Sequence, residues 1–194
     1  MRRKIIYAGL LVCVGAMVGA TATIDVAADE SREGGRHEVV LRDDCDPRDP
    51  AWAPTGGCSL PEGDVTFAEF NALRLSPLAP SLVGHPAWWF DPNYMKIEEG
   101  KRIKVTNEGG RVHTFTEVAN FGGGRVPPLN TSRPADPPIP SLTPAPECVA
   151  AGVIDIPGGG KDVVDGLAAG NHNFQCCIHP WMRTRIHVEA AHNH

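Results

Sequence analysis

The sequence has no extended basic stripe and only one long apolar run. Its 18 Lys and Arg residues are outnumbered by 23 Asp and Glu residues, and the formal net charge is −5. A protein that binds nucleic acid needs a basic stripe to neutralise phosphates, so we expect no nucleic-acid partner. The apolar run covers residues 5–20 and contains three glycines, whereas a membrane-spanning helix needs about 20 apolar residues.

The N-terminus has the composition of an export signal. Arg2, Arg3 and Lys4 precede the apolar run, and small residues follow it up to Ala28. We therefore predict a signal peptide over residues 1–28 and a periplasmic or extracellular location, with an uncleaved anchor as the alternative. Cleavage would remove three basic residues and one acidic one, so the net charge of −5 would become −7.

The remaining chain suits one compact domain with appendages, because it is short and rich in Pro and Gly. Residues 29–85 read as an N-terminal extension with a short strand near residues 37–42. Asp64 or Thr66 is expected to cap a short helix that ends near Leu73 and covers one edge of the domain. Residues 86–190 are expected to form the domain itself and residues 191–194 a tail.

Short alternating segments separated by Gly and Pro turns predict an all-β domain. The expected strands are 94–98, 102–106, 113–118, 153–156, 172–176 and 184–188. This pattern is that of a Greek-key β-sandwich rather than a helical fold.

Three potential copper ligands lie close together near the C-terminus. Cys176, His179 and Met182 have the spacing Cys-x2-His-x2-Met, which places a thiolate, an imidazole and a thioether on one loop. A fourth ligand must come from elsewhere, and His113 is the best candidate because it follows a Gly-Gly turn at the start of a predicted strand.

The odd number of cysteines and the alternation of strand residues together distinguish the ligand thiol, Cys176, from its neighbour Cys177. Five cysteines remain after export, where thiols are expected to be bridged or bound to metal. Strand alternation directs Cys176 toward the core with Phe174, and Cys177 to the opposite face. We predict disulfides Cys45–Cys58 and Cys148–Cys177 among several possible connectivities, with a plain buried thiol at Cys177 as the alternative.

With these residues in view, the segment from Trp88 to Val188 resembles the blue copper proteins, or cupredoxins, such as plastocyanin, azurin and amicyanin. The resemblance implies a cupredoxin-like sandwich over residues 86–190 that holds one copper ion per chain, cycling between Cu(I) and Cu(II). It assigns His113, Cys176, His179 and Met182 as ligands, with the two His and the Cys in a plane and Met as a weak axial ligand. Two departures are Thr114, where many relatives have Asn, and the long Pro/Gly-rich insertion from Asn120 to Glu147.

Other metal sites fit these residues less well. Multicopper oxidases and copper nitrite reductases have a His beside the Cys, whereas Gln175 and Cys177 flank Cys176 here. Binuclear copper centres need two cysteines separated by three residues, and a structural zinc site has no use for Met182.

The expected function is an exported one-electron carrier that is monomeric and is not an enzyme. Ile178, Pro180 and Trp181 are expected to form an exposed apolar patch over His179, where a redox partner protein docks. Core packing is the alternative for Trp181, and extracytoplasmic copper buffering or delivery is the alternative function.

Overall fold

The computed structural model describes residues 37–75, 87–131 and 143–191. The chain divides into residues 1–34 and 35–194, and every described residue belongs to the second unit. The predicted signal peptide over residues 1–28 therefore lies outside the described residues, as does the predicted tail except for Ala191. In the described part, no helix is long and apolar enough to span a membrane.

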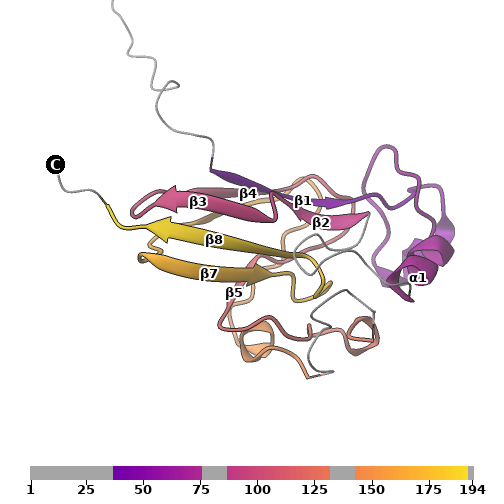
Figure 1. The fold of residues 1–194 in the computed structure, drawn as a ribbon. Helices are drawn as coiled ribbons and strands as arrows, with labels where there is room; N and C mark the ends of the chain where they lie inside the picture. The colour runs from indigo at the N-terminus through magenta and orange to yellow at the C-terminus, as the bar shows by residue number, and fades with distance from the viewer. Residues whose placement is uncertain (1–36, 76–86, 132–142, 192–194) are drawn as a thin grey trace, which may run out of the picture. The chain divides into compact units, whose positions relative to one another are not determined.

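The described chain forms two four-stranded sheets with little helix (Figure 1). The first sheet has the order β2-β1-β4-β6, from β1 (Glu38–Asp43), β2 (Trp88–Asp91), β4 (Ile103–Asn107) and β6 (Lys161–Val164). Strand β1 pairs antiparallel with β2 and parallel with β4. A sheet that mixes both pairings in this way cannot be a simple meander of hairpins.

The second sheet has the order β3-β8-β7-β5, from β3 (Tyr94–Glu98), β5 (Thr116–Val118), β7 (Gly170–Gln175) and β8 (Arg183–Glu189). Strands β3 and β8 run parallel, while β7 is antiparallel to both of its neighbours. The register places Thr116 opposite Gln175 and Gln175 opposite Arg183. The start of β5, the end of β7 and the start of β8 therefore meet at one end of the sandwich.

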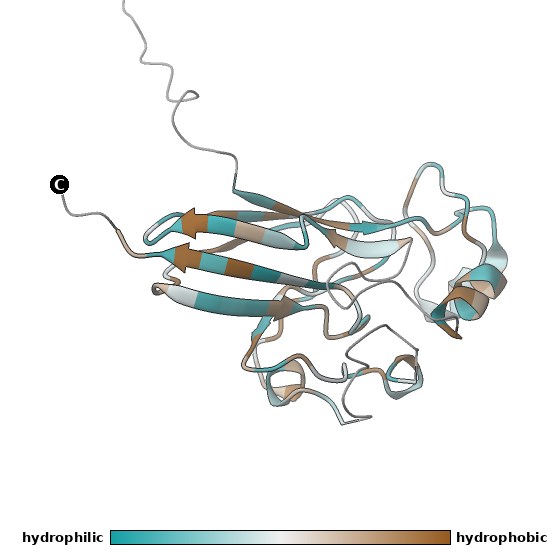
Figure 2. Ribbon diagram, viewed as in Figure 1, coloured by the Kyte–Doolittle hydropathy of each residue, from teal (hydrophilic) through white to brown (hydrophobic). Residues whose placement is uncertain are grey.

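The core lies between the two sheets and follows strand alternation. In β1, Val39 and Leu41 are fully buried while their neighbours are half-buried, and in β8 Ile186 and Val188 point inward. Figure 2 shows the resulting alternation of apolar and polar residues along β8. The predicted all-β sandwich is confirmed.

The boundary predicted at residue 85 requires a correction. Strand β1 was expected in an extension outside the domain, but it lies between β2 and β4 in the first sheet. The reason is that a β-strand with one apolar face is stable only when that face is buried, and Val39 and Leu41 are buried in the core of the sandwich.

One predicted strand is also wrong, two strands, β2 and β6, were missed, and the strand expected from His113 begins only at Thr116. Residues 153–156 form no strand; only Ile156 pairs, in an isolated bridge with His113. Ile154 is 58% exposed and Ile156 alone of this segment is buried in the core, so the apolar residues do not form one buried strand face. The edge strand is β6 instead, which begins with the charged pair Lys161 and Asp162 and so lacked a clear apolar alternation.

The segment between β1 and β2 carries two short helices. The 3-10 helix η1 covers Pro50–Thr55 and the helix α1 covers Phe67–Leu75. The predicted cap is confirmed at Thr66, whose hydroxyl accepts the Glu69 N–H at 3.2 Å while the Glu69 carboxylate accepts the Thr66 N–H at 2.9 Å. The predicted disulfide Cys45–Cys58 is also present and closes the loop around η1.

The insertion after β5 is held against the loop that follows β7. It includes η2 (Pro127–Leu129), and η3 (Pro146–Val149) lies at its far end. The predicted disulfide Cys148–Cys177 is present, and Arg125 donates its backbone N–H to the Cys177 carbonyl at 2.6 Å. The insertion is thus fixed beside the residue that follows Cys176.

Candidate metal centre

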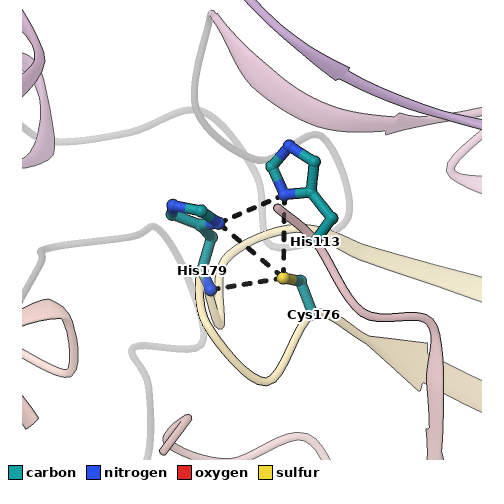
Figure 3. A group of neighbouring side chains, drawn as sticks. All are labelled: His113, Cys176 and His179. Carbon is teal, nitrogen blue, oxygen red and sulfur yellow. Dashed lines mark hydrogen bonds between the residues drawn. The ribbon is translucent and has the colours of Figure 1, made fainter. Parts of the chain in front are cut away.

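Three predicted ligands converge at the end of the sandwich where β5 begins and β7 ends. Cys176 directly follows β7 and His179 lies on the loop to β8. His113 lies in the segment between β4 and β5, held by its two backbone hydrogen bonds to Ile156. Figure 3 shows the two imidazoles and the thiol facing one another.

The three donor atoms are spaced as ligands of one ion. Cys176 Sγ lies 3.8 Å from His113 Nδ1 and 3.7 Å from His179 Nδ1, and the two nitrogens are 3.2 Å apart. An ion bonded at about 2.3 Å to sulfur and about 2.0–2.1 Å to nitrogen, as zinc is, separates its ligand atoms by about 3.3–3.8 Å. The residues therefore fit a single metal ion, and in the described part of the chain they form the one such group of His, Cys, Asp and Glu side chains.

The chemistry of the donors favours copper over a hard cation. One thiol and two imidazoles are soft or borderline ligands, and all three side chains are buried, with His179 5% exposed and the others 0%. Cys176 is the one free cysteine among the described residues, as the pairing of the other four predicted.

Met182 lies on the same loop as Cys176 and His179. It is fully buried, and its backbone carbonyl accepts the Cys176 N–H at 3.0 Å while its own N–H donates to the His179 carbonyl at 2.9 Å. These bonds fold the loop into a tight turn around the thiol. The role of the thioether as an axial ligand stays a prediction.

Asp43, which sequence analysis did not single out, is bonded to the candidate ligand His113. Its Oδ2 lies 2.7 Å from His113 Nε2, and both side chains are fully buried. When His113 is neutral, as a metal ligand is, the carboxylate fixes the tautomer, because Nε2–H donates to Asp43 and the Nδ1 lone pair is left facing Cys176. A carboxylate in this position commonly orients a metal-binding imidazole.

A sequence signal for Asp43 does exist. It has the same strand parity as the buried residues Val39 and Leu41, so an acid there must point inward and find a partner. The signal was missed because β1 was placed outside the domain.

The turn after β4 is shaped to bring this carboxylate to His113. Asp43 accepts the N–H groups of Gly110 and Arg111 at 3.0 and 2.9 Å. A Cβ at Gly109 would lie 2.1 Å from Asp43 Oδ2, and one at Gly110 would lie 2.7 Å from Cys45 Sγ. The Gly-Gly pair is therefore required by close packing against the acid and the Cys45–Cys58 disulfide.

Mutual interactions shift the protonation of the site. Burial acts to lower the pKa of His113, but its hydrogen bond to Asp43 and its interactions with Cys176 outweigh burial and raise the pKa to about 9. Burial acts to raise the pKa of the Cys176 thiol, but the hydrogen bond and charge of His113 prevail and lower it. In the metal-free protein the site thus favours a thiolate beside an imidazolium, and the thiolate is the form that binds metal.

Thr114 links the two ligand segments in place of the Asn found in many cupredoxins. Its hydroxyl accepts the Cys177 N–H at 2.7 Å. Its backbone N–H and that of His179 each approach Cys176 Sγ at 3.4 Å. Thr114 therefore ties the upstream segment to the ligand loop, and the sulfur receives two N–H groups that stabilise its negative charge.

The apolar docking patch predicted over His179 requires a correction. Trp181 is fully buried, Pro180 is buried, and Ile178 is half-buried. Phe70 of α1 packs against the His179 and Trp181 rings at centroid distances of 6.4 and 6.1 Å. The segment between β1 and β2 covers this face, so Trp181 is a core residue, as its alternative interpretation held.

The two sheets and the buried His-Cys-His cluster define a β-sandwich with a candidate copper centre at one end. No protein-family model matches the sequence, and no curated protein matches it.

Solved structures similar to this chain include cupredoxins. A purple cupredoxin from Nitrosopumilus maritimus is 13% identical, with 58% of this chain and 96% of that chain covered and a TM-score of 0.38. A reduced amicyanin variant is 15% identical, with 58% and 78% covered and a TM-score of 0.35. A copper-containing nitrite reductase from Thermus scotoductus is 18% identical, with 53% and 20% covered and a TM-score of 0.33. These identities and TM-scores are low, so the fold and the site are assigned from the strand order and donor geometry of this chain.

Proposed function

We propose that this chain is an exported mononuclear type 1 copper protein that carries one electron at a time. The observation that carries the proposal is the convergence of Cys176 Sγ, His113 Nδ1 and His179 Nδ1 within 4.8 Å of one another in the core. Met182 would supply the fourth, axial ligand. Bound copper would supply a redox couple, Cu(I)/Cu(II), that exchanges one electron without breaking a bond.

The chain's own residues hold the donors in place without the metal. His113 is oriented by Asp43, and Cys176 is held by N–H groups from Thr114 and His179. Arg183 donates from Nε to the Pro180 carbonyl at 2.7 Å, and this bond holds the ligand loop to the start of β8. Donors that do not move between redox states keep the reorganisation energy small, and this rigidity suits electron transfer.

His179 is the proposed route for the electron. Of the three clustered ligands it alone has measurable exposure, at 5%, and its neighbour Ile178 is half-buried. We place the contact with a redox partner at the rim around Ile178, rather than over Pro180 and Trp181.

Copper buffering or delivery is the second candidate, favoured by the acidic, exported character predicted from the sequence. The burial of all three donors supports the carrier instead, because an ion enclosed by a protein core exchanges slowly. The two functions differ in whether the bound ion cycles reversibly between oxidation states.

Copper loading followed by visible spectroscopy tests the proposal. We expect one copper per chain and an intense thiolate-to-copper charge-transfer band that disappears in Cys176→Ser. The matched control is Cys148→Ser combined with Cys177→Ser, which removes the disulfide beside the site, leaves the Cys176 thiol, and should keep the band. A colourless protein that binds Cu(II) equally well with and without Cys176 would refute it.

A further inference from the structure

An apolar pocket of about 300 Å³ opens beside His179 and is formed by the segments that cover the metal centre. Its walls include the rings of Trp52, Phe67 and Phe70, and His179 and Ile178 form the side next to the ligand loop. This volume is at the lower end of the range of about 300–1,000 Å³ found for small-molecule sites. It suits a ligand with a single ring.

The aromatic wall is a packed and ordered cluster. Trp52 and Phe67 meet edge to face at a centroid distance of 5.1 Å, and Phe70 lies 5.4 Å from Trp52 and 4.7 Å from Trp88. The Trp52 indole N–H donates to the Val65 carbonyl at 3.2 Å, so the ring is fixed from outside the pocket. Aromatic rings fixed in this way favour a flat ligand over a bulky one, because flat groups pack well against aromatic rings.

Two arginines border this apolar space. Arg74 donates to the Asn71 side chain at 2.9 Å and to the Pro128 carbonyl at 3.3 Å. Arg111 lies over Trp52 at 4.8 Å from the ring centroid and donates to oxygens of Thr55 and Gly57. These partners are neutral, and within the described residues neither guanidinium forms an ion pair with a carboxylate.

The charge around the pocket is therefore positive. No Asp or Glu is among the residues that line it, although the chain as a whole is acidic. Asp43 accepts the Arg111 backbone N–H, and its Oδ2 is also bonded to His113. A ligand with a negative group would supply the missing counter-charge to Arg74 and Arg111.

We propose that this pocket binds a small planar organic monoanion, with its ring against Trp52, Phe67 and Phe70 and its anionic group toward Arg74 and Arg111. The ligand would lie against the His179 imidazole, on the side away from Cys176. The inference goes beyond electron carriage and does not depend on it, because every lining group belongs to the protein itself.

Calorimetric titration of the full chain with benzoate and with its neutral analogue benzamide tests the proposal, in copper-free and Cu(I)-loaded protein. We expect one benzoate per chain, bound at least about tenfold more tightly than benzamide because a charge-assisted hydrogen bond is lost in the amide. Binding should shift the NMR signals of the Trp52 indole and the His179 ring.

Two variants and one control locate the site. Arg74→Gln should reduce the preference for benzoate severalfold, because Arg111 alone then faces the carboxylate, while leaving benzamide binding unchanged. Leu129→Trp should fill the pocket and abolish binding of both molecules. The matched control is Arg102→Gln, which removes an exposed arginine that pairs with Asp165 outside the pocket and should change neither affinity.

Equal binding of benzoate and benzamide, or a preference that is undiminished in Arg74→Gln, would overturn the proposal that the ligand is an anion. A pocket filled by another part of this chain would bind neither probe, and that result would overturn the site. Because the copper-free form is titrated in parallel, failure to bind copper would leave this test unaffected.

Discussion

Asp43 and His113 form a buried acid-imidazole pair that belongs to the metal centre. The carboxylate lies 2.7 Å from Nε2 while Nδ1 faces Cys176 at 3.8 Å. A negative group this close to a ligand favours the more highly charged metal ion, because both are shielded from solvent. Asp43 should therefore stabilise Cu(II) relative to Cu(I).

Replacing Asp43 with Asn tests this role. The amide keeps the size of the acid, and its oxygen can still accept a hydrogen bond from His113 Nε2, but it lacks the negative charge. We expect a higher reduction potential and a loss of Cu(II) affinity of about 10–100-fold, measured by redox titration and by competition with a chelator.

The matched control is Glu117→Gln, because Glu117 forms a similar pair with His172 at 2.6 Å, away from the ligands. That variant should leave the potential unchanged. A potential that is the same in Asp43→Asn and in the unmodified protein would contradict the assignment.

At the scale of residues, the sequence was sufficient for the groups with distinctive spacing. Cys176 and His179 could be predicted from their loop, and His113 from its place after a Gly-Gly turn. The strand parity of Asp43 indicates that it is buried, but its pairing with His113 could not be predicted, because the two residues are 70 positions apart in the chain and the parallel pairing of β1 with β4 brings them together.

Among the elements, the ligand loop between β7 and β8 is fixed from outside by the Cys148–Cys177 disulfide. This bridge spans 29 residues and joins the end of the insertion to the residue that follows Cys176. Cross-linking a loop of that length restricts the unfolded chain and stabilises the fold by about 3–4 kcal/mol on an entropic estimate.

The double variant Cys148→Ser, Cys177→Ser should lose about 3–4 kcal/mol of unfolding free energy in denaturant titrations. Its comparison is Cys45→Ser, Cys58→Ser, whose shorter loop of 13 residues predicts a loss of about 3 kcal/mol. An unchanged denaturation midpoint after removal of the Cys148–Cys177 bridge would show that it does not hold the insertion.

Strands β5 and β7 are also joined by an ion pair that depends on pH. Burial acts to lower the pKa of His172, but its hydrogen bonds to Glu117 and to the Ala168 carbonyl prevail and raise it above 6.5. Because the folded-state pKa is raised, the pair stabilises the fold fully below the unfolded value and ceases to do so as pH rises through the folded value.

Glu117→Gln should therefore destabilise the protein more at about pH 5.5, where His172 is charged, than at about pH 9. The expected loss is under about 1 kcal/mol because Glu117 is half exposed. Denaturant unfolding at both pH values measures this loss of unfolding free energy, and a larger loss at the higher pH would contradict the predicted direction of the pH dependence.

Strands were predicted correctly where apolar and polar residues alternate and the apolar ones are buried, and incorrectly where apolar residues are exposed. Residues 94–98 and 184–188 alternate and are strands, whereas residues 153–156 are apolar but exposed at Ile154. The burial of Trp181 could not be read from the loop itself, because the aromatic cover comes from α1, in a segment far away in the sequence.

At the scale of the whole molecule, the cover over the metal centre distinguishes this chain from a bare sandwich. The segment between β1 and β2 brings Trp52 and Phe70 over His179, and the insertion after β5 brings η2 to the same pocket. Access to His179 is thereby limited to a small lined opening instead of a broad exposed patch. This arrangement is consistent with an electron carrier whose contacts are selected by shape and charge.

A reversible redox titration of the copper-loaded protein, followed by its visible charge-transfer band, tests the central claim most directly. We predict that the band bleaches on addition of one electron per chain and returns fully on reoxidation, with no loss of copper over repeated cycles. A protein that releases its copper on reduction, or whose bound copper shows no thiolate-dependent band, would contradict the account.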